Sequence, residues 1–246
     1  MEKIKRISAG SYDLNRFLHG GYESDIISTI YGPGGSGKTN FCMLAAVSVA
    51  RKGGRVIFID TEGGFSTDRF SQMHKGDTLE IEKSLQNIML LKPTSFSEQE
   101  NNFEALLKEI DRTEINLIII DSIAMLYRLE LAEAIQTEKQ EKIQNVNRNL
   151  AKQLRTLNEI ARKKNIPIII TNQVYASHVR DGFGENEMKR TNMVGGDLLK
   201  YWSKCLIELQ QNIAKRKLVL RKHRSLPEKS MGFEVTNEGI RKKGLF

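Results

Sequence analysis

The sequence has no hydrophobic run long enough to cross a lipid bilayer, since none approaches the roughly 18 apolar residues that a transmembrane helix needs. Residues 1–7 carry charges without an apolar segment behind them, which argues against a secretory signal. Only two cysteines are present, Cys42 and Cys205, and no Cys and His residues are spaced for a zinc site. We therefore expect two buried thiols in the reducing cytoplasm.

Low-complexity segments, internal repeats and proline-rich linkers are also absent. Nothing in the composition therefore divides the chain. Hydrophobic residues make up 39% of the sequence and charged residues 28%, which is ordinary for a globular protein with a full core. We expect residues 1–246 to form a single domain.

Acidic residues are scarce at the carboxyl-terminal end of the chain. The formal net charge is +8, and residues 204–246 hold eleven Lys and Arg against four Glu and no Asp. A concentrated basic end suggests a polyanionic partner, with nucleic acid as the leading candidate. A solvated basic face that only aids solubility is the alternative.

A glycine-rich stretch at 30–39 fits the pattern G-x-x-x-x-G-K-[ST] of a phosphate-binding loop. Its glycines allow backbone N–H groups to converge on phosphate oxygens, and the following helix adds the positive end of its dipole. Lys38 supplies a charge for the outer phosphates, and the Thr39 hydroxyl can ligate Mg²⁺. The predicted nucleotide contacts are Gly32, Pro33, Gly34, Gly35, Ser36, Gly37, Lys38 and Thr39. A glycine-rich turn with a chance Lys-Thr pair is the alternative.

Buried strands and amphipathic helices alternate along most of the chain. We expect strands at 26–31, 55–60, 87–92, 116–122 and 166–171, and helices at 14–18, 36–51, 68–74, 99–111 and 143–165. This alternation predicts an α/β fold with a doubly wound, mostly parallel sheet. Three segments near the end, 205–210, 217–222 and 232–236, have turns between them and no helices, which predicts antiparallel strands that continue the sheet.

Three polar residues lie at the carboxyl ends of predicted strands, at the edge where open α/β sheets bind their ligands. Asp121 can hold Mg²⁺ directly or through water, and Glu62 can orient and deprotonate an attacking water. Gln173 can sense the γ-phosphate of a nucleotide. An acid at a strand end is common, so the hypothesis depends on all three occurring after one phosphate loop.

These segments together resemble the core of RecA/RadA-type recombinases. The resemblance covers nearly the whole chain and rests on residues 7–18, 31–39, 59–65, 117–122, 170–174 and 195–197. It implies a RecA-like P-loop NTPase core that uses ATP and Mg²⁺. It also implies that Glu62 activates water, that Gln173 couples the γ-phosphate to DNA-binding loops, and that Arg69 stacks on adenine. A surface arginine is the alternative for Arg69.

The two DNA-binding loops of that family would fall at about 127–139 and 176–192. The second contains Arg180, Lys189 and Arg190 but also three acids, so a connector without DNA contacts is the alternative. Further basic residues follow at Lys215, Arg216, Lys217, Arg221, Lys222, His223 and Arg224. The run at 221–224 has no offsetting acid nearby in our interpretation, and we expect it to be the main electrostatic contact with DNA.

Two departures from the recombinase pattern shape the expected function. The amino-terminal helical domain and its docking linker are missing from this sequence, and Lys222 replaces an acid that caps ATP bound by the adjacent subunit. We therefore expect an ATP- and DNA-binding accessory protein of recombination with weak ATPase activity. Its expected partners are single-stranded or branched DNA, the RadA recombinase and a Holliday-junction resolvase. The alternatives are a filament-forming, DNA-dependent recombinase and a KaiC-like signalling ATPase that does not bind DNA.

Overall fold

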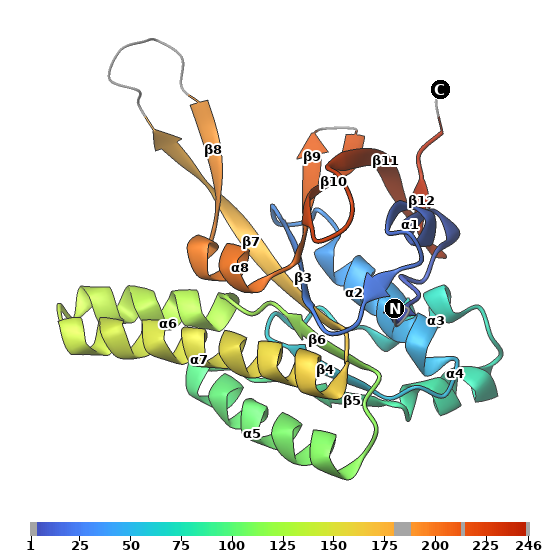
Figure 1. The fold of residues 1–246 in the computed structure, drawn as a ribbon, viewed down its shortest axis with the longest axis horizontal. Coiled ribbons are helices and arrows are strands. Elements are labelled where there is room, and N and C mark those ends of the chain that lie inside the picture. The colour runs from blue at the N-terminus through green and yellow to red at the C-terminus, as the bar shows by residue number, and fades with distance from the viewer. Residues whose placement is uncertain (1–3, 180–187, 213–214, 245–246) are drawn as a thin grey trace.

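The computed structural model of the chain describes residues 4–179, 188–212 and 215–244. One large sheet runs through the molecule, with helices on both of its faces (Figure 1). Its strands are β3 (Ile27–Gly32), β4 (Val56–Asp60), β5 (Ile88–Leu91), β6 (Leu117–Asp121), β7 (Ile168–Val179), β8 (Met188–Met193), β9 (Cys205–Asn212), β10 (Lys215–His223), β11 (Lys229–Thr236) and β12 (Gly239–Lys242). A separate two-stranded sheet pairs β1 (Arg6–Ile7) with β2 (Tyr22–Glu23).

The strand order is β12-β11-β10-β9-β3-β7-β6-β4-β5, with β8 paired to β7 outside this series. All pairs from β9 through β3 to β5 are parallel, whereas β9, β10, β11 and β12 pair with one another antiparallel. The predicted change to antiparallel strands near the end of the chain is confirmed. It begins after β9, because the preceding helix carries the chain back so that β9 can join the parallel part.

The helices form a layer on each face of this sheet. They are α1 (Tyr12–Phe17), α2 (Lys38–Ala50), α3 (Thr67–His74), α4 (Thr78–Leu85), α5 (Phe96–Arg112), α6 (Met125–Gln136), α7 (Gln140–Lys164) and α8 (Gly196–Trp202). One apolar cluster joins the sheet to α1, α2 and α3, and a second joins it to α5, α6, α7 and α8. None of these helices is long and apolar enough to cross a membrane.

Strand β6 shows why the buried strands read as unbroken apolar runs. Successive side chains of a strand point to opposite faces of the sheet. Leu117 and Ile119 belong to the cluster around α2, whereas Ile118 and Ile120 belong to the cluster around α5 and α7. Both faces are therefore covered by helices, and both sets of residues must be apolar. The predicted doubly wound α/β fold is confirmed.

The segment predicted as the first DNA-binding loop, 127–139, is mostly helical, so the expectation of a loop there is wrong. Helix α6 covers residues up to Gln136, with Leu126, Tyr127 and Ala134 buried. Figure 1 shows α6 beside α7 at one end of the molecule. The apolar side chains gain more from packing against this neighbour than an extended loop would allow.

In the second predicted loop, 176–192, the described residues 176–179 and 188–192 form a β-ribbon. Strand β7 continues past the edge of the parallel sheet to Val179, and β8 returns beside it from Met188. Ser177 pairs with Arg190 and His178 with Lys189. Lys189 and Arg190 thus lie on this ribbon, whereas Arg180 falls outside the described residues.

Candidate functional site

The phosphate-loop sequence forms the turn between β3 and α2. Gly37, immediately before the helix, has φ of 105°, in the left-handed region that favours glycine. Gly32 ends β3 so close to β9 that a Cβ atom there would lie 2.5 Å from the Leu209 carbonyl oxygen. These two glycines let the chain turn sharply while α2 points its amino-terminal N–H groups towards the loop.

Lys38 is the first residue of α2, and only 6% of it is exposed. Its Nζ atom donates hydrogen bonds to the carbonyl oxygens of Gly32, at 3.1 Å, and Pro33, at 3.0 Å. Burial lowers the pKa of Lys38, while the nearby carboxylates of Glu62 and Asp121 act in the opposite direction. The amine thus lies inside the curve of the loop, where phosphate oxygens would give it stronger, charge-assisted partners.

Asp121 ends β6 and lies beside the phosphate loop. Its Oδ1 atom accepts a hydrogen bond from the Thr171 hydroxyl of β7. Burial raises the pKa of Asp121, whereas the hydroxyls of Thr171 and Thr39 act to lower it. Among the described residues, the buried Asp121 Oδ2 and Ser36 Oγ atoms have no hydrogen-bond partner of normal geometry. Buried oxygens without a hydrogen-bond partner, next to the Thr39 hydroxyl, fit the ligand set of a Mg²⁺ ion carried by a nucleotide.

The segment after β4, which carries Glu62, is organised by Asp60. The buried Asp60 carboxylate accepts hydrogen bonds from the backbone N–H groups of Glu62 (3.3 Å), Gly64 (3.1 Å) and Phe65 (2.9 Å). The Thr61 hydroxyl donates to the Ser122 carbonyl and accepts from its N–H group, both at 2.8 Å. Neither residue was among those that we expected from the sequence to shape the site. Asp60 and Thr61 are polar residues between an apolar strand and the glycines at 63–64, and this pattern would have indicated them.

Glu62, just after β4, meets Gln173 of β7, which lies opposite Gly32 where the parallel pairing of β7 with β3 ends. The Gln173 side-chain amide donates to both Glu62 carboxylate oxygens, at 3.2 and 3.1 Å. Glu62 is exposed, so water can reach its carboxylate. The structure therefore brings together the residue expected to activate water and the residue expected to sense the γ-phosphate, although they are 111 positions apart in the sequence.

Comparison with known proteins agrees with this geometry. A family model described as Rad51 matches residues 1–243 of the 246. The chain belongs to the Rad51 family.

Several archaeal proteins of this family are similar over almost their whole length. The DNA repair and recombination protein RadB of Methanococcus maripaludis strain C5 is 39% identical over 228 residues, which is 92% of this chain and 96% of that protein. The RadB protein of Methanothermobacter thermautotrophicus is 36% identical over 247 residues, or 98% and 97%. These matches place the chain beside the archaeal RadB proteins within the Rad51 family and confirm the resemblance seen in the sequence.

Arg69 is the residue expected from the family resemblance to stack on adenine. Its Nε atom donates to Asn40 Oδ1 of α2 at 2.9 Å, and Nη1 and Nη2 donate to the carbonyl oxygens of Asn237 and Thr236. Burial lowers its pKa. These bonds use the edge of the guanidinium group and leave its flat faces for stacking, so they are compatible with the expected role.

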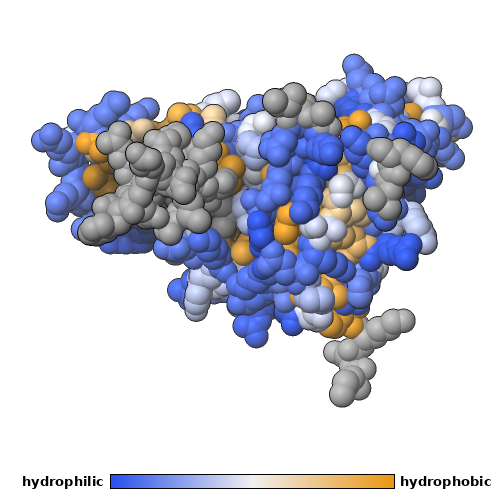
Figure 2. Space-filling view, turned by 90° about the horizontal axis from the view of Figure 1, so that it is seen from above, coloured by the Kyte–Doolittle hydropathy of each residue, from blue (hydrophilic) through white to orange (hydrophobic). Residues whose placement is uncertain are grey.

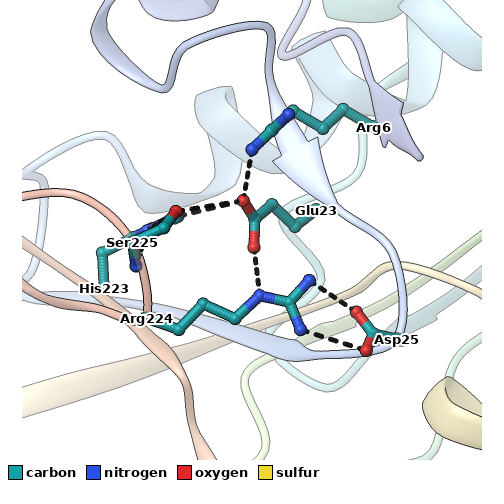
Figure 3. A network of polar contacts seen from close by, with 6 residues as sticks. All are labelled: Arg6, Glu23, Asp25, His223, Arg224 and Ser225. Carbon is teal, nitrogen blue, oxygen red and sulfur yellow. Dashed lines mark hydrogen bonds and ion pairs between the residues drawn. The ribbon is translucent and has the colours of Figure 1, made fainter. Parts of the chain in front are cut away.

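The surroundings of the basic run at 221–224 differ from those that we expected from the sequence. Arg224 is paired with two carboxylates, donating from Nε to Glu23 Oε2 and from Nη2 to Asp25 Oδ1 at 2.7 Å (Figure 3). Glu23 is buried and also accepts a hydrogen bond from Arg6 at 2.6 Å. His223 lies nearby, with its side chain 2% exposed. We call this group of Arg6, Glu23, Asp25, His223 and Arg224 the Glu23 cluster.

Arg221 is likewise held by carboxylates. Its guanidinium group contacts Glu208 and Glu228, both at 2.6 Å. The expectation that no acid offsets this run is therefore wrong, because strand pairing and the turn after β10 bring acids from elsewhere to its arginines. Lys222, which replaces the acid of other recombinases, donates from Nζ to the Lys200 carbonyl oxygen of α8 at 2.7 Å.

Proposed function

We propose that this Rad51-family protein binds ATP with Mg²⁺, hydrolyses it weakly, and serves as a DNA-binding accessory protein of homologous recombination and DNA repair. The convergence of Lys38, Asp121, Glu62 and Gln173 at one edge of the sheet carries the nucleotide part of this proposal. The names of the archaeal relatives, DNA repair and recombination proteins, support the biological role.

Each residue of the site has a separate task in this mechanism. The loop N–H groups and Lys38 bind the phosphates, while Thr39 and Asp121 would hold Mg²⁺. A Mg²⁺ ion held by these two residues would supply positive charge that neutralises the phosphate oxygens. Glu62 orients a water molecule for attack on the γ-phosphate and accepts its proton. The Asp60 and Thr61 contacts keep the Glu62 segment in place.

The contact between Gln173 and Glu62 gives a physical reason for weak hydrolysis. Both oxygens of the Glu62 carboxylate accept hydrogen bonds from the Gln173 amide, which leaves fewer lone pairs free for the attacking water. A γ-phosphate that attracts the Gln173 amide would release Glu62 and shift β7, whose far end forms the ribbon with β8. Nucleotide state would thus be coupled to that ribbon, where Lys189 and Arg190 lie.

Replacing Glu62 with glutamine should preserve ATP binding and remove hydrolysis. The side chain keeps its shape, but an amide cannot accept the proton of the attacking water. Phosphate release measures hydrolysis, and a fluorescent ATP analogue measures binding. Hydrolysis at the wild-type rate in Glu62→Gln would assign the base to another residue.

Replacing Gln173 with alanine should separate hydrolysis from its coupling to DNA. Glu62 loses the two hydrogen bonds that restrain it, so basal hydrolysis should equal or exceed that of the wild type. DNA should then change the rate of the variant less than it changes the rate of the wild type. A variant with lower basal hydrolysis but intact DNA response contradicts the proposed restraint.

Two other functions deserve comparison with this proposal. A filament-forming recombinase would need contacts across subunits at the nucleotide, whereas Lys222 contacts Lys200 of its own chain. Electron microscopy with ATP and single-stranded DNA tests that alternative. A KaiC-like signalling ATPase would not bind DNA, and salt-dependent DNA binding tests that one. The match to the Rad51 family supports a role in recombination over the KaiC-like alternative.

A further inference from the structure

A large basic groove lies on the carboxyl-terminal side of the sheet, between α1 and strands β9 to β12. Its volume is about 1020 Å³, and residues from all five elements line it. Basic residues dominate the lining, including Arg16, Lys215, Lys217, Lys229 and Lys242. Figure 2 looks onto this end of the molecule and shows a mostly hydrophilic surface around a narrower apolar strip.

The charges of this groove differ from those at 221–224 because they are not neutralised by carboxylates. Within the described ranges, no salt bridge involves Arg16, Lys215, Lys217, Lys229 or Lys242. The lining contains a single carboxylate, Asp13, which accepts a hydrogen bond from the Lys242 backbone N–H group at 2.7 Å. The groove therefore keeps a net positive charge that an anionic ligand can use.

The lysines of the groove lie on its strands, so their charges are spaced along the strand direction. Lys215 and Lys217 alternate with one residue between them and share a face of β10. Their cross-strand partners in β9 are the neutral residues Asn212 and Gln210, and Lys217 lies opposite Gly232 of β11. Cations spaced along a strand suit the repeating charge of a phosphodiester backbone, whereas a single phosphate would need a compact cluster.

An exposed tyrosine stands at the same side of α1 as one of these cations. Tyr12 is 77% exposed, the most exposed of the large hydrophobic and aromatic side chains in the described part of the chain. It lies four residues before Arg16, so both project from one face of α1. Arg16 lines the groove, and Tyr12 lies about one helical turn before it in α1. Proteins that bind single-stranded nucleic acid combine a basic groove with aromatic side chains on which bases stack.

We propose that this groove binds the backbone of single-stranded DNA, with Tyr12 as a stacking surface for a base. The proposal rests on the DNA binding proposed above and names the surface responsible. An acidic peptide is the competing ligand. It would need apolar anchors, but the aromatic ring in the lining, Phe17, is buried and covered by the Lys229 amine at 5.1 Å from the ring centre.

The test measures anisotropy of a fluorescein-labelled oligothymidylate at several NaCl concentrations. Lys215→Ala/Lys217→Ala should weaken binding and flatten the log–log salt dependence by about 1.4 units, because each lost phosphate contact removes about 0.7 for a single strand. Tyr12→Ala should weaken binding roughly tenfold without changing the salt slope. The matched control is Lys108→Ala/Lys152→Ala, which removes two exposed lysines on α5 and α7.

A third variant blocks the groove without changing its charge. A Cβ atom at Gly232 would lie 3.8 Å from the nearest side chain, the Lys243 Cβ atom, so Gly232→Leu should fold normally. Its added side chain projects into the lining and should reduce binding of the oligonucleotide. Binding of a fluorescent ATP analogue should stay at the wild-type value in every groove variant, which reports an intact fold.

The possible outcomes separate this inference from the proposed function. If the wild type does not bind DNA, the DNA part of the proposed function fails, and the inference fails with it. If the wild type binds and the groove variants bind equally well, only the inference is wrong. Tighter binding of duplex than of single strands of equal length would overturn the single-strand assignment. If the groove variants lose only as much affinity as the Lys108→Ala/Lys152→Ala control, the groove is not a specific site, and the loss reflects the lower overall charge.

Discussion

Replacement of Lys38 by alanine is expected to abolish tight ATP binding while leaving the protein folded. The Lys38 amine lies against the phosphate-loop carbonyl oxygens of Gly32 and Pro33, where it can reach the outer phosphates. Hydrogen bonds between a charged amine and phosphate are about twice as strong as neutral ones. Removal of the amine therefore takes away both a charge and several donors, and we expect at least about a hundredfold loss of affinity.

Isothermal titration with ATP and Mg²⁺ measures this loss, and thermal unfolding followed by circular dichroism verifies the fold. The control is Lys38→Arg, which keeps the charge but changes its geometry and should lose less affinity. Unchanged affinity in Lys38→Ala would show that the nucleotide binds elsewhere. The same result would remove the structural basis for the roles proposed for Glu62 and Gln173.

Arg224→Ala is expected to destabilise the protein, although Arg224 was expected from the sequence to bind DNA. The variant leaves the buried Glu23 carboxylate with Arg6 as its main partner. Breaking a buried ion pair by removing one partner costs about 3–5 kcal/mol, and we expect about 3 kcal/mol because Arg6 remains. Urea unfolding at neutral pH measures the difference.

The control for this variant is Arg241→Ala. Arg241 also pairs with a glutamate, Glu234, but its side chain is 67% exposed, so we expect a loss below about 1 kcal/mol. Equal stability of Arg224→Ala and the wild type, together with weaker DNA binding, would return Arg224 to the role expected from the sequence.

The pH dependence of the same measurement gives an independent test. Burial raises the pKa of Glu23, but the hydrogen bonds from Arg224 and Arg6 outweigh it and hold the pKa below its ordinary value. A carboxyl group with a lowered pKa stabilises the folded state above its unfolded pKa, about 4.3, and this contribution is lost as pH falls through the folded value. The difference between wild type and Arg224→Ala should therefore be full at neutral pH and shrink below about pH 4.

The parts of the structure that could be predicted from the sequence are those set by local pattern. Ile118, Ile119 and Ile120 required a strand covered on both faces, and the glycines with Lys38 required a phosphate loop after a strand. Asp121 and Glu62 could be placed at one edge because parallel strands end together. The first two inferences use residues that are neighbours in the chain, and the third uses a general property of parallel sheets.

The parts that could not be predicted depend on contacts between distant segments. Arg224 reads as a free cation beside Lys222, but its carboxylate partners lie 201 and 199 positions away. The family resemblance predicts a loop where the structure has helix α6, whose apolar side chains pack in the same cluster as the neighbouring helix α7. Asp60 was overlooked because its role depends on three backbone N–H groups that converge only when the segment folds.

The position of β3 between β7 and β9 has a consequence for how the chain is made. The strand that leads into the phosphate loop is complete once residue 32 has been synthesised, yet both of its partners come from residues 168–212. Until then Ile27 and Ile30, which are fully buried in the finished protein, have no sheet to join. A ribosome that stalls before this point would release a chain with an open strand edge and exposed apolar surface, which is the kind of species that aggregates or recruits chaperones.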